Sequence, residues 1–116
     1  MAVTHRIKAG TYQGTPEAGT TASGNSTSAD PPSLTPSWGS DDNLWLACMA
    51  FAGNGSITAH PTNYKTNVQS LATTIGAVVL AAATARRGLA AASENPGAFT
   101  HTSLQRAANT IAIRGA

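Results

Sequence analysis

An apolar run that follows a proline-rich approach constrains the fold more than any other stretch of this sequence. It lies within residues 30–51, DPPSLTPSWGSDDNLWLACMAF. The three prolines fix φ and lack a backbone N–H, which excludes a helix interior and a central strand before the turn expected at residues 39–42. From Leu44 to Phe51 every side chain is apolar, so a strand here is apolar on both of its faces. The run therefore predicts a strand buried between two layers.

The composition indicates one small domain, residues 1–116, with a weak core. Of the 116 residues 10% are charged, and there are only two residues each of Trp, Tyr and Phe. A chain of this length forms one domain at most. Its many alanine, glycine, serine and threonine residues bury little apolar area each. We therefore expect a marginally stable monomer that associates with copies of itself or with a larger assembly.

The charge and the single cysteine exclude several classes of partner and site. A net charge of +2 is too small and too scattered to predict a nucleic-acid or anionic-membrane partner. Cys48 is the only cysteine, which excludes an internal disulfide and a thiolate metal cluster and predicts a small buried hydrophobe. The first ten residues lack the apolar segment of a signal peptide. The apolar run Ile75–Ala85 is too short to span a bilayer, so we expect a soluble protein.

Short alternating runs on both sides of the apolar run predict further strands. Val3, His5 and Ile7 alternate with polar residues, as in a half-buried strand. The hydroxyl-rich residues 15–29 fit a linker or a solvent-facing edge strand, and their position between two strand signals favours the edge strand. The GNG sequence at residues 53–55 predicts a hairpin that leads into an alternating run at residues 56–60. A turn then follows, in which Tyr64 is expected to cap the sandwich.

Residues 68–93 leave two interpretations open. The alanine content of AVVLAAATARRGLAAAS favours helix, whereas the β-branched residues and the glycines at positions 76 and 88 favour strand. The ENPG sequence at residues 94–97 ends this segment, and residues 107–114 predict a last strand whose two isoleucines face inward. The sum is five to seven short strands joined by turns, which is typical of an all-β sandwich. The residues expected in its core are Leu44, Trp45, Leu46, Met49, Phe51, Ile111 and Ile113.

Four motifs in a fixed order resemble a domain that recurs in the virion proteins of tailed bacteriophages. They are PPSLTPSWGSDDNLW, PTNY, ARRGLAAASENPGAF and TIAIR, within a match that spans residues 15–116. The resemblance implies an antiparallel β-sandwich of jelly-roll or concanavalin/laminin-G type, and a strand over residues 78–92. The family domain has further N-terminal strands, so we expect a sandwich in this chain that is incomplete and is completed by oligomerisation.

Few residues are candidates for chemistry. Asp41 and Asp42 supply too few oxygen ligands for Ca²⁺, and we expect them in a solvated turn. His5, His60 and His101 have no spacing typical of a zinc site, and the sequence has no G-x-S-x-G turn to support a hydrolytic triad. We therefore expect no catalytic residue, no metal and no cofactor.

The only charge doublet, Arg86 and Arg87, is a candidate for a subunit interface. Neighbours on a strand point to opposite faces. One of the two fits an intersubunit salt bridge with Glu94 or Asp30, although an ordinary solvent-facing pair explains the doublet as well. The other candidate interface residues are Val3 and Ile7, on the apolar side of the first alternating run.

Loop residues offer a second candidate surface, for glycan binding. Aromatic side chains stack on sugars in carbohydrate-binding sandwiches, and the candidates here are Trp38, Asn54 and Tyr64. Trp38 lies in a Pro/Ser/Gly loop, where packing over the end of the sandwich is the competing role. Trp45 lies within the predicted buried strand and is expected in the core instead.

The residues and the resemblance together predict a non-enzymatic phage virion structural protein. The favoured role is a capsid decoration (cement) protein that assembles as a symmetric oligomer, with a homotrimer favoured because capsids offer local threefold positions. The expected partners are copies of the chain and the major capsid protein or another virion protein, with no nucleic acid and no membrane. The expected location is the virion, on the capsid surface rather than the tail. The alternative is a carbohydrate- or receptor-binding module of a tail fibre or spike, although 116 residues leave no room for a fibre's attachment segment and shaft.

Overall fold

The computed structural model describes residues 2–102 and 105–116, and all of its regular secondary structure is β. No helix in these ranges meets the length and apolarity that crossing a membrane requires. The described strands are β1 Glu17–Ala18, β2 Ala22–Asn25, β3 Ser28–Ala29, β4 Asp41–Ala52, β5 Ile57–Ala59, β6 Lys65–Ile75, β7 Val78–Ala91, β8 Phe99–His101 and β9 Gln105–Arg114.

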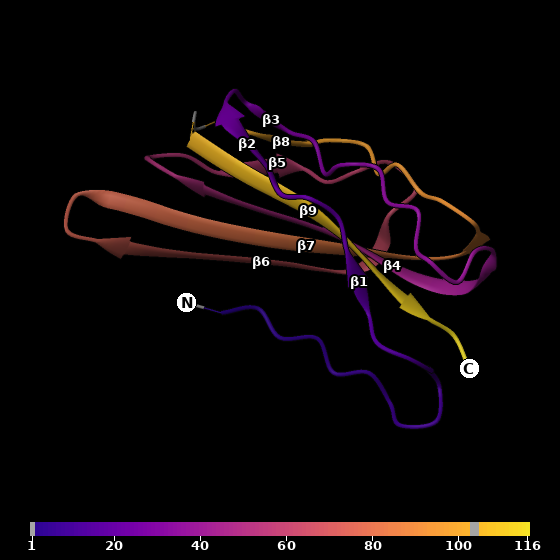
Figure 1. Ribbon diagram of the computed structural model, residues 1–116. Helices are drawn as coiled ribbons and strands as arrows, with labels where there is room; N and C mark the ends of the chain where they lie inside the picture. Colours follow the sequence, from indigo (N-terminus) through magenta and orange to yellow (C-terminus); the bar gives the residue numbers. More distant parts are fainter. Residues whose placement is uncertain (1, 103–104) are drawn as a thin grey trace.

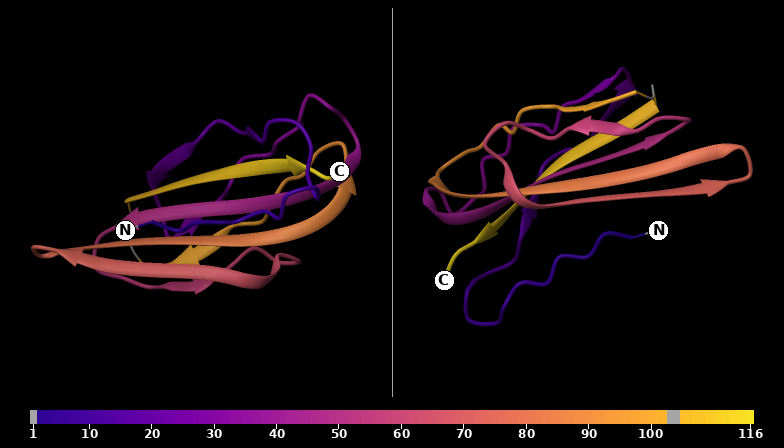
Figure 2. Two further views of the ribbon diagram at one scale, coloured as in Figure 1. Left: turned by 90° about the horizontal axis from the view of Figure 1, so that it is seen from below. Right: turned by 180° about the vertical axis from the view of Figure 1, so that it is seen from behind.

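The strands form two antiparallel sheets that pack as layers (Figure 1). The larger sheet has the order β1-β9-β4-β7-β6, with β2 also paired to β9, and the smaller sheet has the order β3-β8-β5. The prediction of an antiparallel all-β fold is therefore confirmed. The views of Figures 1 and 2 agree that the smaller sheet covers one side of the larger sheet and that the N-terminal segment runs along the other side.

Strand β4 is the centre of the larger sheet. It pairs along its whole length with β7 on one edge and over residues 43–52 with β9 on the other edge. Trp45 lies opposite Arg87 and Ala112, so these three side chains point to the same face, toward the smaller sheet. The central position that the apolar run predicts for this strand agrees with the observed strand order.

The core combines a few large side chains of β4 with alanines on its neighbours. Trp45 is fully buried and donates its indole N–H to the carbonyl oxygen of Leu89 at 3.0 Å. The ring of Phe51 stacks on that of His101, from the smaller sheet, with ring centres 5.3 Å apart. The inward positions of β7 and β9 are filled by small residues, which leave room for these rings: Ala81, Ala83, Ala85, Ala108 and Ala112.

The prediction that β4 is buried on both faces is only half correct. Its inward residues are buried, whereas on the opposite face only Leu46 is buried, Leu44 and Cys48 are half-buried, and Ala50 is exposed. The smaller sheet supplies a layer on one side only. On the other side, β4 is covered in part by the extended N-terminal segment.

The faces predicted for the last strand are inverted. Ile111 lies opposite Leu46, and Ile113 opposite Leu44, so both isoleucines point away from the core between the sheets. The residues that face this core are Ala108, Thr110 and Ala112, each at most 2% exposed. The reason is side-chain volume, because the position opposite Trp45 admits an alanine beside the indole. Ile111 stays half-buried, and Ile113 is 7% exposed.

The hairpin predicted at residues 53–55 is wrong. Both edges of β4 are already occupied, by β7 and β9, so β5 cannot pair with it. After Gly53 the chain instead crosses to the smaller sheet, where β5 pairs with β8. The interpretation of residues 15–29 as edge strands is confirmed by β1 and β2. Residues 68–93 include the second part of β6 and all of β7, so the strand interpretation holds there.

Two smaller differences concern chain segments near these strands. The turn before β4 spans residues 36–39, closed by the Gly39 N–H to the Pro36 carbonyl at 3.2 Å, so Asp41 and Asp42 already belong to the strand. Residues 2–9 are extended and alternate in burial as predicted, but they form no strand pairing with the described part of the chain.

Candidate functional site

One broad face of the larger sheet is the strongest candidate for an interaction surface. We call it the outer face, because it points away from the smaller sheet. The paired strands place on it Leu44, Leu46, Cys48 and Ala50 of β4, Leu80, Ala82, Thr84 and Arg86 of β7, and Ala107, Asn109, Ile111 and Ile113 of β9. All of these are apolar except one threonine, one arginine and one asparagine. The outward side of a sandwich is usually polar, so the apolar outer face is the candidate for an interaction surface.

The N-terminal arm, residues 2–9, is the part of the chain that lies on this face (Figure 2). Val3, His5 and Ile7 are half-buried, and the residues between them are exposed. Ile7 lines a recess of about 270 Å³ together with Leu44 and Ile113. The candidate interface residues Val3 and Ile7 thus share the outer face with Arg86, which lies opposite Leu46.

The arm leaves part of the outer face open. A recess of about 290 Å³ has Ala2 and Val3 at one side and the alanines of three strands, Ala50, Ala82 and Ala107, at its base. Its surface is almost entirely apolar, and Cys48 also lines it. The geometry suits a further apolar element, because there is little here to bind a polar ligand.

Arg87 points to the opposite side from Arg86, and there it forms an ion pair within the chain. Its Nη1 lies 3.0 Å from Oε1 of Glu94, whose side chain is only 9% exposed. The hydroxyl of Tyr64 donates to the same carboxylate oxygen at 3.2 Å. The sequence pointed to Glu94 as a partner in another subunit, whereas the structure places this pair inside one chain. Arg87 therefore pairs with a buried carboxylate inside one chain, and a role for it at a subunit interface stays a prediction.

Tyr64 is part of this buried cluster and not of a binding surface. Its ring is 1% exposed. Burial raises the pKa of its hydroxyl well above the usual value, and the negative charge of Glu94 raises it further. The phenol therefore stays neutral and serves as a hydrogen-bond donor to Glu94.

The residues proposed for glycan binding are not brought together. Trp38 is half-buried before the start of β4, and Asn54 is exposed beyond its end. At about 3.3 Å per residue, the length of this strand separates the two by roughly 36 Å. Because Tyr64 is buried, no two members of the predicted set share a surface. The three residues therefore do not form one site, since the loops that carry Trp38 and Asn54 lie at opposite ends of the sheet, and glycan binding at either loop alone stays a prediction.

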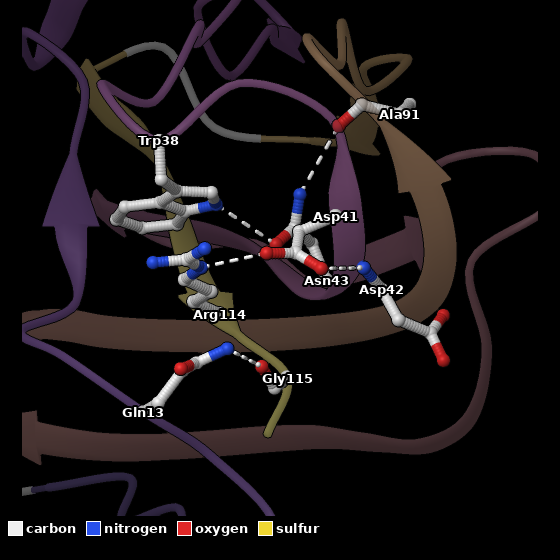
Figure 3. Close-up of polar contacts among 8 residues, drawn as sticks. All are labelled: Gln13, Trp38, Asp41, Asp42, Asn43, Ala91, Arg114 and Gly115. Carbon is white, nitrogen blue, oxygen red and sulfur yellow. Dashed lines mark hydrogen bonds and ion pairs between the residues drawn. The ribbon is translucent and has the colours of Figure 1, made fainter.

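Trp38 belongs to a polar cluster at the start of β4 (Figure 3). Its indole N–H donates to Oδ1 of Asn43 at 3.0 Å, and Nδ2 of Asn43 donates to the carbonyl oxygen of Ala91 at 3.1 Å. Asn43 is 2% exposed. Its amide therefore connects the loop before β4 to the end of β7, which explains why an asparagine is tolerated in the buried face of this strand.

The neighbouring ion pair fixes the last strand at its C-terminal end (Figure 3). Nε of Arg114 lies 2.6 Å from Oδ2 of Asp41. The hydrogen bond from Arg114 lowers the pKa of the Asp41 carboxyl group, with a smaller effect from the backbone N–H of Asp42. The carboxylate of Asp41 is thus engaged in an ion pair with the last strand. In the part of the chain that the structure describes, no group of three or more metal-ligating residues occurs.

Gly115 is held tightly in the same region. Its N–H donates to the carbonyl oxygen of Asp42 at 2.8 Å, and its own carbonyl accepts from Nε2 of Gln13 at 2.8 Å. A Cβ atom at this position would fall on the Asp42 carbonyl oxygen. The approach of the two backbones therefore requires a glycine.

Replacement of Gly115 by alanine is expected to lower the free energy of unfolding by about 1–3 kcal/mol, because the clash separates the ends of β4 and β9. Gly88→Ala is the matched control, since nothing lies within 4 Å of a Cβ there. The control is expected to be neutral or to stabilise by about 0.4–1 kcal/mol. Urea unfolding of both variants measures the difference. Equal stability of the two would show that the backbones are not in close contact at Gly115.

Cys48 lies half-buried on the outer face, and burial raises the pKa of its thiol to about 11. A group whose pKa is higher in the folded chain than in the unfolded chain stabilises the folded state. This stabilisation is complete at pH values below the pKa of the unfolded chain, here 9.0. This stabilisation is lost as the pH rises from there toward 11, because the unfolded chain then releases its proton more readily.

We therefore expect wild-type stability to fall more than that of Cys48→Ala between about pH 8 and about pH 10.5, by an extra amount on the order of 2 kcal/mol. Tyr64 contributes to both proteins alike and cancels in the comparison. Chemical unfolding at the two pH values measures the effect. Parallel losses in the two proteins would mean that the thiol is not buried.

The sequence analysis did not predict an apolar outer face. The apolar residues of β4 were predicted, but Ile111 and Ile113 were expected on the other side. The sequence does show a regular alternation of isoleucine with alanine and threonine in residues 110–113. This alternation puts both isoleucines on one face of the strand, and the pairing register determines which face that is. Register is a property of strand pairing, and the sequence alone does not fix it.

The three histidines are separate in the structure. His5 is on the arm, with Nε2 2.6 Å from Oγ1 of Thr84, His60 is exposed in a loop, and His101 is buried in the smaller sheet. Comparison of the chain with protein-family models, with curated proteins and with solved structures found no significant match.

Proposed function

We propose that this protein is a non-enzymatic structural protein of a phage virion, in which it acts as a capsid decoration protein and assembles as a symmetric oligomer on the particle surface. The observation that supports this most is the apolar outer face of the larger sheet. Its three central strands present mostly leucine, isoleucine and alanine, and the arm leaves a recess of about 290 Å³ among them. A surface of this kind is covered by protein in a working assembly.

The motif order described above gives the proposal its biological setting. The proposed fold type is accordingly the jelly-roll or concanavalin/laminin-G-like sandwich, with a further layer supplied by oligomerisation. The partners are other copies of the chain, with a homotrimer favoured, and the major capsid protein or another virion protein. Among the described residues, two ion pairs lie within the chain: Arg87 with Glu94, and Arg114 with Asp41.

The alternative of a glycan- or receptor-binding module has less support. Its candidate residues lie at opposite ends of the larger sheet or inside the core. The outer face itself has few of the polar groups that fix sugar hydroxyls.

Two measurements on the purified protein test the proposal. Light scattering coupled to size exclusion is expected to give an oligomer, and co-sedimentation with capsid shells that lack this protein is expected to show binding. A stable folded monomer with no affinity for such shells would overturn the proposal. Glycan binding that is lost in Trp38→Ala, with the fold retained, would favour the alternative instead.

A further inference from the structure

The N-terminal arm is shaped like a strand but is attached to its own chain only weakly. Its inward side chains, Val3, His5 and Ile7, rest on the outer face. Within the described residues, the backbone of residues 2–7 forms no hydrogen bond with the rest of the chain. The polar contact that holds this segment is the one between His5 and Thr84. Detaching the arm therefore breaks no strand ladder and costs little.

A turn with glycine at its corner separates the arm from the body. The N–H of Thr11 donates to the carbonyl oxygen of Lys8 at 3.2 Å, and its hydroxyl donates to the same oxygen at 2.7 Å. Gly10 has φ of +81° and no atom within 4 Å of a Cβ position. The residues after the turn are fixed, because Gln13 donates its N–H to the Arg114 carbonyl at 3.0 Å. The turn can open while the body stays unchanged.

The surface beneath the arm is larger than the arm. Ala2 and Val3 line the recess of about 290 Å³, and Ala50, which also lines it, is exposed. Leu71, on the neighbouring strand β6, is 39% exposed. A second copy packed against this place would cover these side chains. An arm that crosses between the two copies would then be buried on both sides.

We propose that the arm is exchanged between subunits, so that residues 2–9 of each copy lie on the outer face of a neighbouring copy. This inference rests on the oligomer of the proposed function and names the element that joins its subunits. Exchange keeps every contact of the arm, including the hydrogen bond between His5 and Thr84, and makes each one intersubunit. Swapping an identical element is a low-cost route to assembly. In a ring, each arm passes to the next subunit and the contacts close.

The lone cysteine makes the exchange measurable. Val3 and Cys48 line the same recess, so Val3→Cys places a second thiol in the recess that holds Cys48. Equal amounts of ¹⁴N- and ¹⁵N-labelled Val3→Cys protein are unfolded, mixed, refolded and oxidised. Non-reducing electrophoresis and mass spectrometry of the digest then follow, with the oligomeric state of the same sample measured by light scattering. Wild type and Val3→Cys/Cys48→Ala are the controls that lack the designed disulfide.

Arm exchange predicts covalent dimers and larger species, with disulfide-linked peptides that join the introduced thiol at position 3 of one label to Cys48 of the other label. Disulfides between positions 3 and 48 that join only like labels, or no such disulfide, would overturn the exchange. If that result comes from an oligomer, the proposed function keeps its oligomer and loses only the swapped arm. If it comes from a monomer, both proposals fail.

Discussion

Arg87→Met is expected to lower the free energy of unfolding by about 3–5 kcal/mol, because it leaves a buried carboxylate without its counter-charge. Glu94 is 9% exposed, and Arg87 is its ion-pair partner at 3.0 Å. The hydroxyl of Tyr64 remains as a donor to Glu94, but one neutral hydrogen bond does not compensate a buried negative charge. Urea unfolding followed by circular dichroism measures the loss.

The adjacent residue provides the matched control. Arg86→Met removes the same charge and the same side-chain length from the outer face, where the change is expected to stay below about 1 kcal/mol. The double variant Arg87→Met/Glu94→Gln is expected to recover most of the loss, because it no longer buries an unpaired charge. Similar losses in the two arginine variants would contradict the assignment of Arg87 to the interior.

Trp45→Ala is expected to cost about 3–5 kcal/mol, the range for removal of a fully buried aromatic side chain. The indole is 0% exposed, packs among alanines of β7 and β9, and binds the carbonyl of Leu89. Small domains have about 5–15 kcal/mol of stability in total. The variant should therefore melt far below the wild type or remain unfolded, as measured in thermal unfolding by circular dichroism.

The second tryptophan is the control for this substitution. Trp38→Ala removes a half-buried ring and leaves Oδ1 of Asn43 without the indole donor. Its expected cost is about 1–2 kcal/mol, the range for one lost hydrogen bond with some packing. A larger loss at Trp38 than at Trp45 would contradict the assignment of Trp45 to the core.

The sequence predicted the positions of the strands better than it predicted which strands pair and which side chains face the core. The apolar run of β4 marks the central strand, because a strand that is paired on both edges has few side chains in contact with solvent and so can consist of apolar residues. The edge strands of residues 15–29 follow from hydroxyl-rich composition. The GNG sequence gave a wrong hairpin prediction. A tight turn reverses the direction of the chain, but it does not determine which strand pairs with the strand before the turn.

The inward side of β9 could not be predicted from hydrophobicity. Isoleucine is more apolar than alanine, yet alanine and threonine face the core because Trp45 and Phe51 already fill it. Volume complementarity between strands far apart in the sequence decides this, and it depends on register. Arg87 was matched with Glu94 from the sequence, but in another subunit, because the face on which Arg87 lies is set by the pairing of β7 with β4.

The alanine content of residues 77–92 favours helix by propensity alone, and the structure has strand there. Tertiary context overrides propensity, because alanine is the residue that fits beneath the large side chains of β4. The same small residues on the outer side, Ala50, Ala82 and Ala107, leave the apolar recess that the proposed assembly would fill.

The central claim is that the outer face is buried between subunits, and the mass of Ala50→Arg in solution tests it most directly. Ala50 is exposed in the single chain and lies at the base of the recess, so an arginine there leaves the isolated fold intact. Thr100→Arg, on the exposed side of the smaller sheet, is the control. We predict that light scattering gives an oligomer for the wild type and for Thr100→Arg, and a folded monomer for Ala50→Arg. A monomeric wild type, or an Ala50→Arg protein that keeps the wild-type mass, would contradict the account.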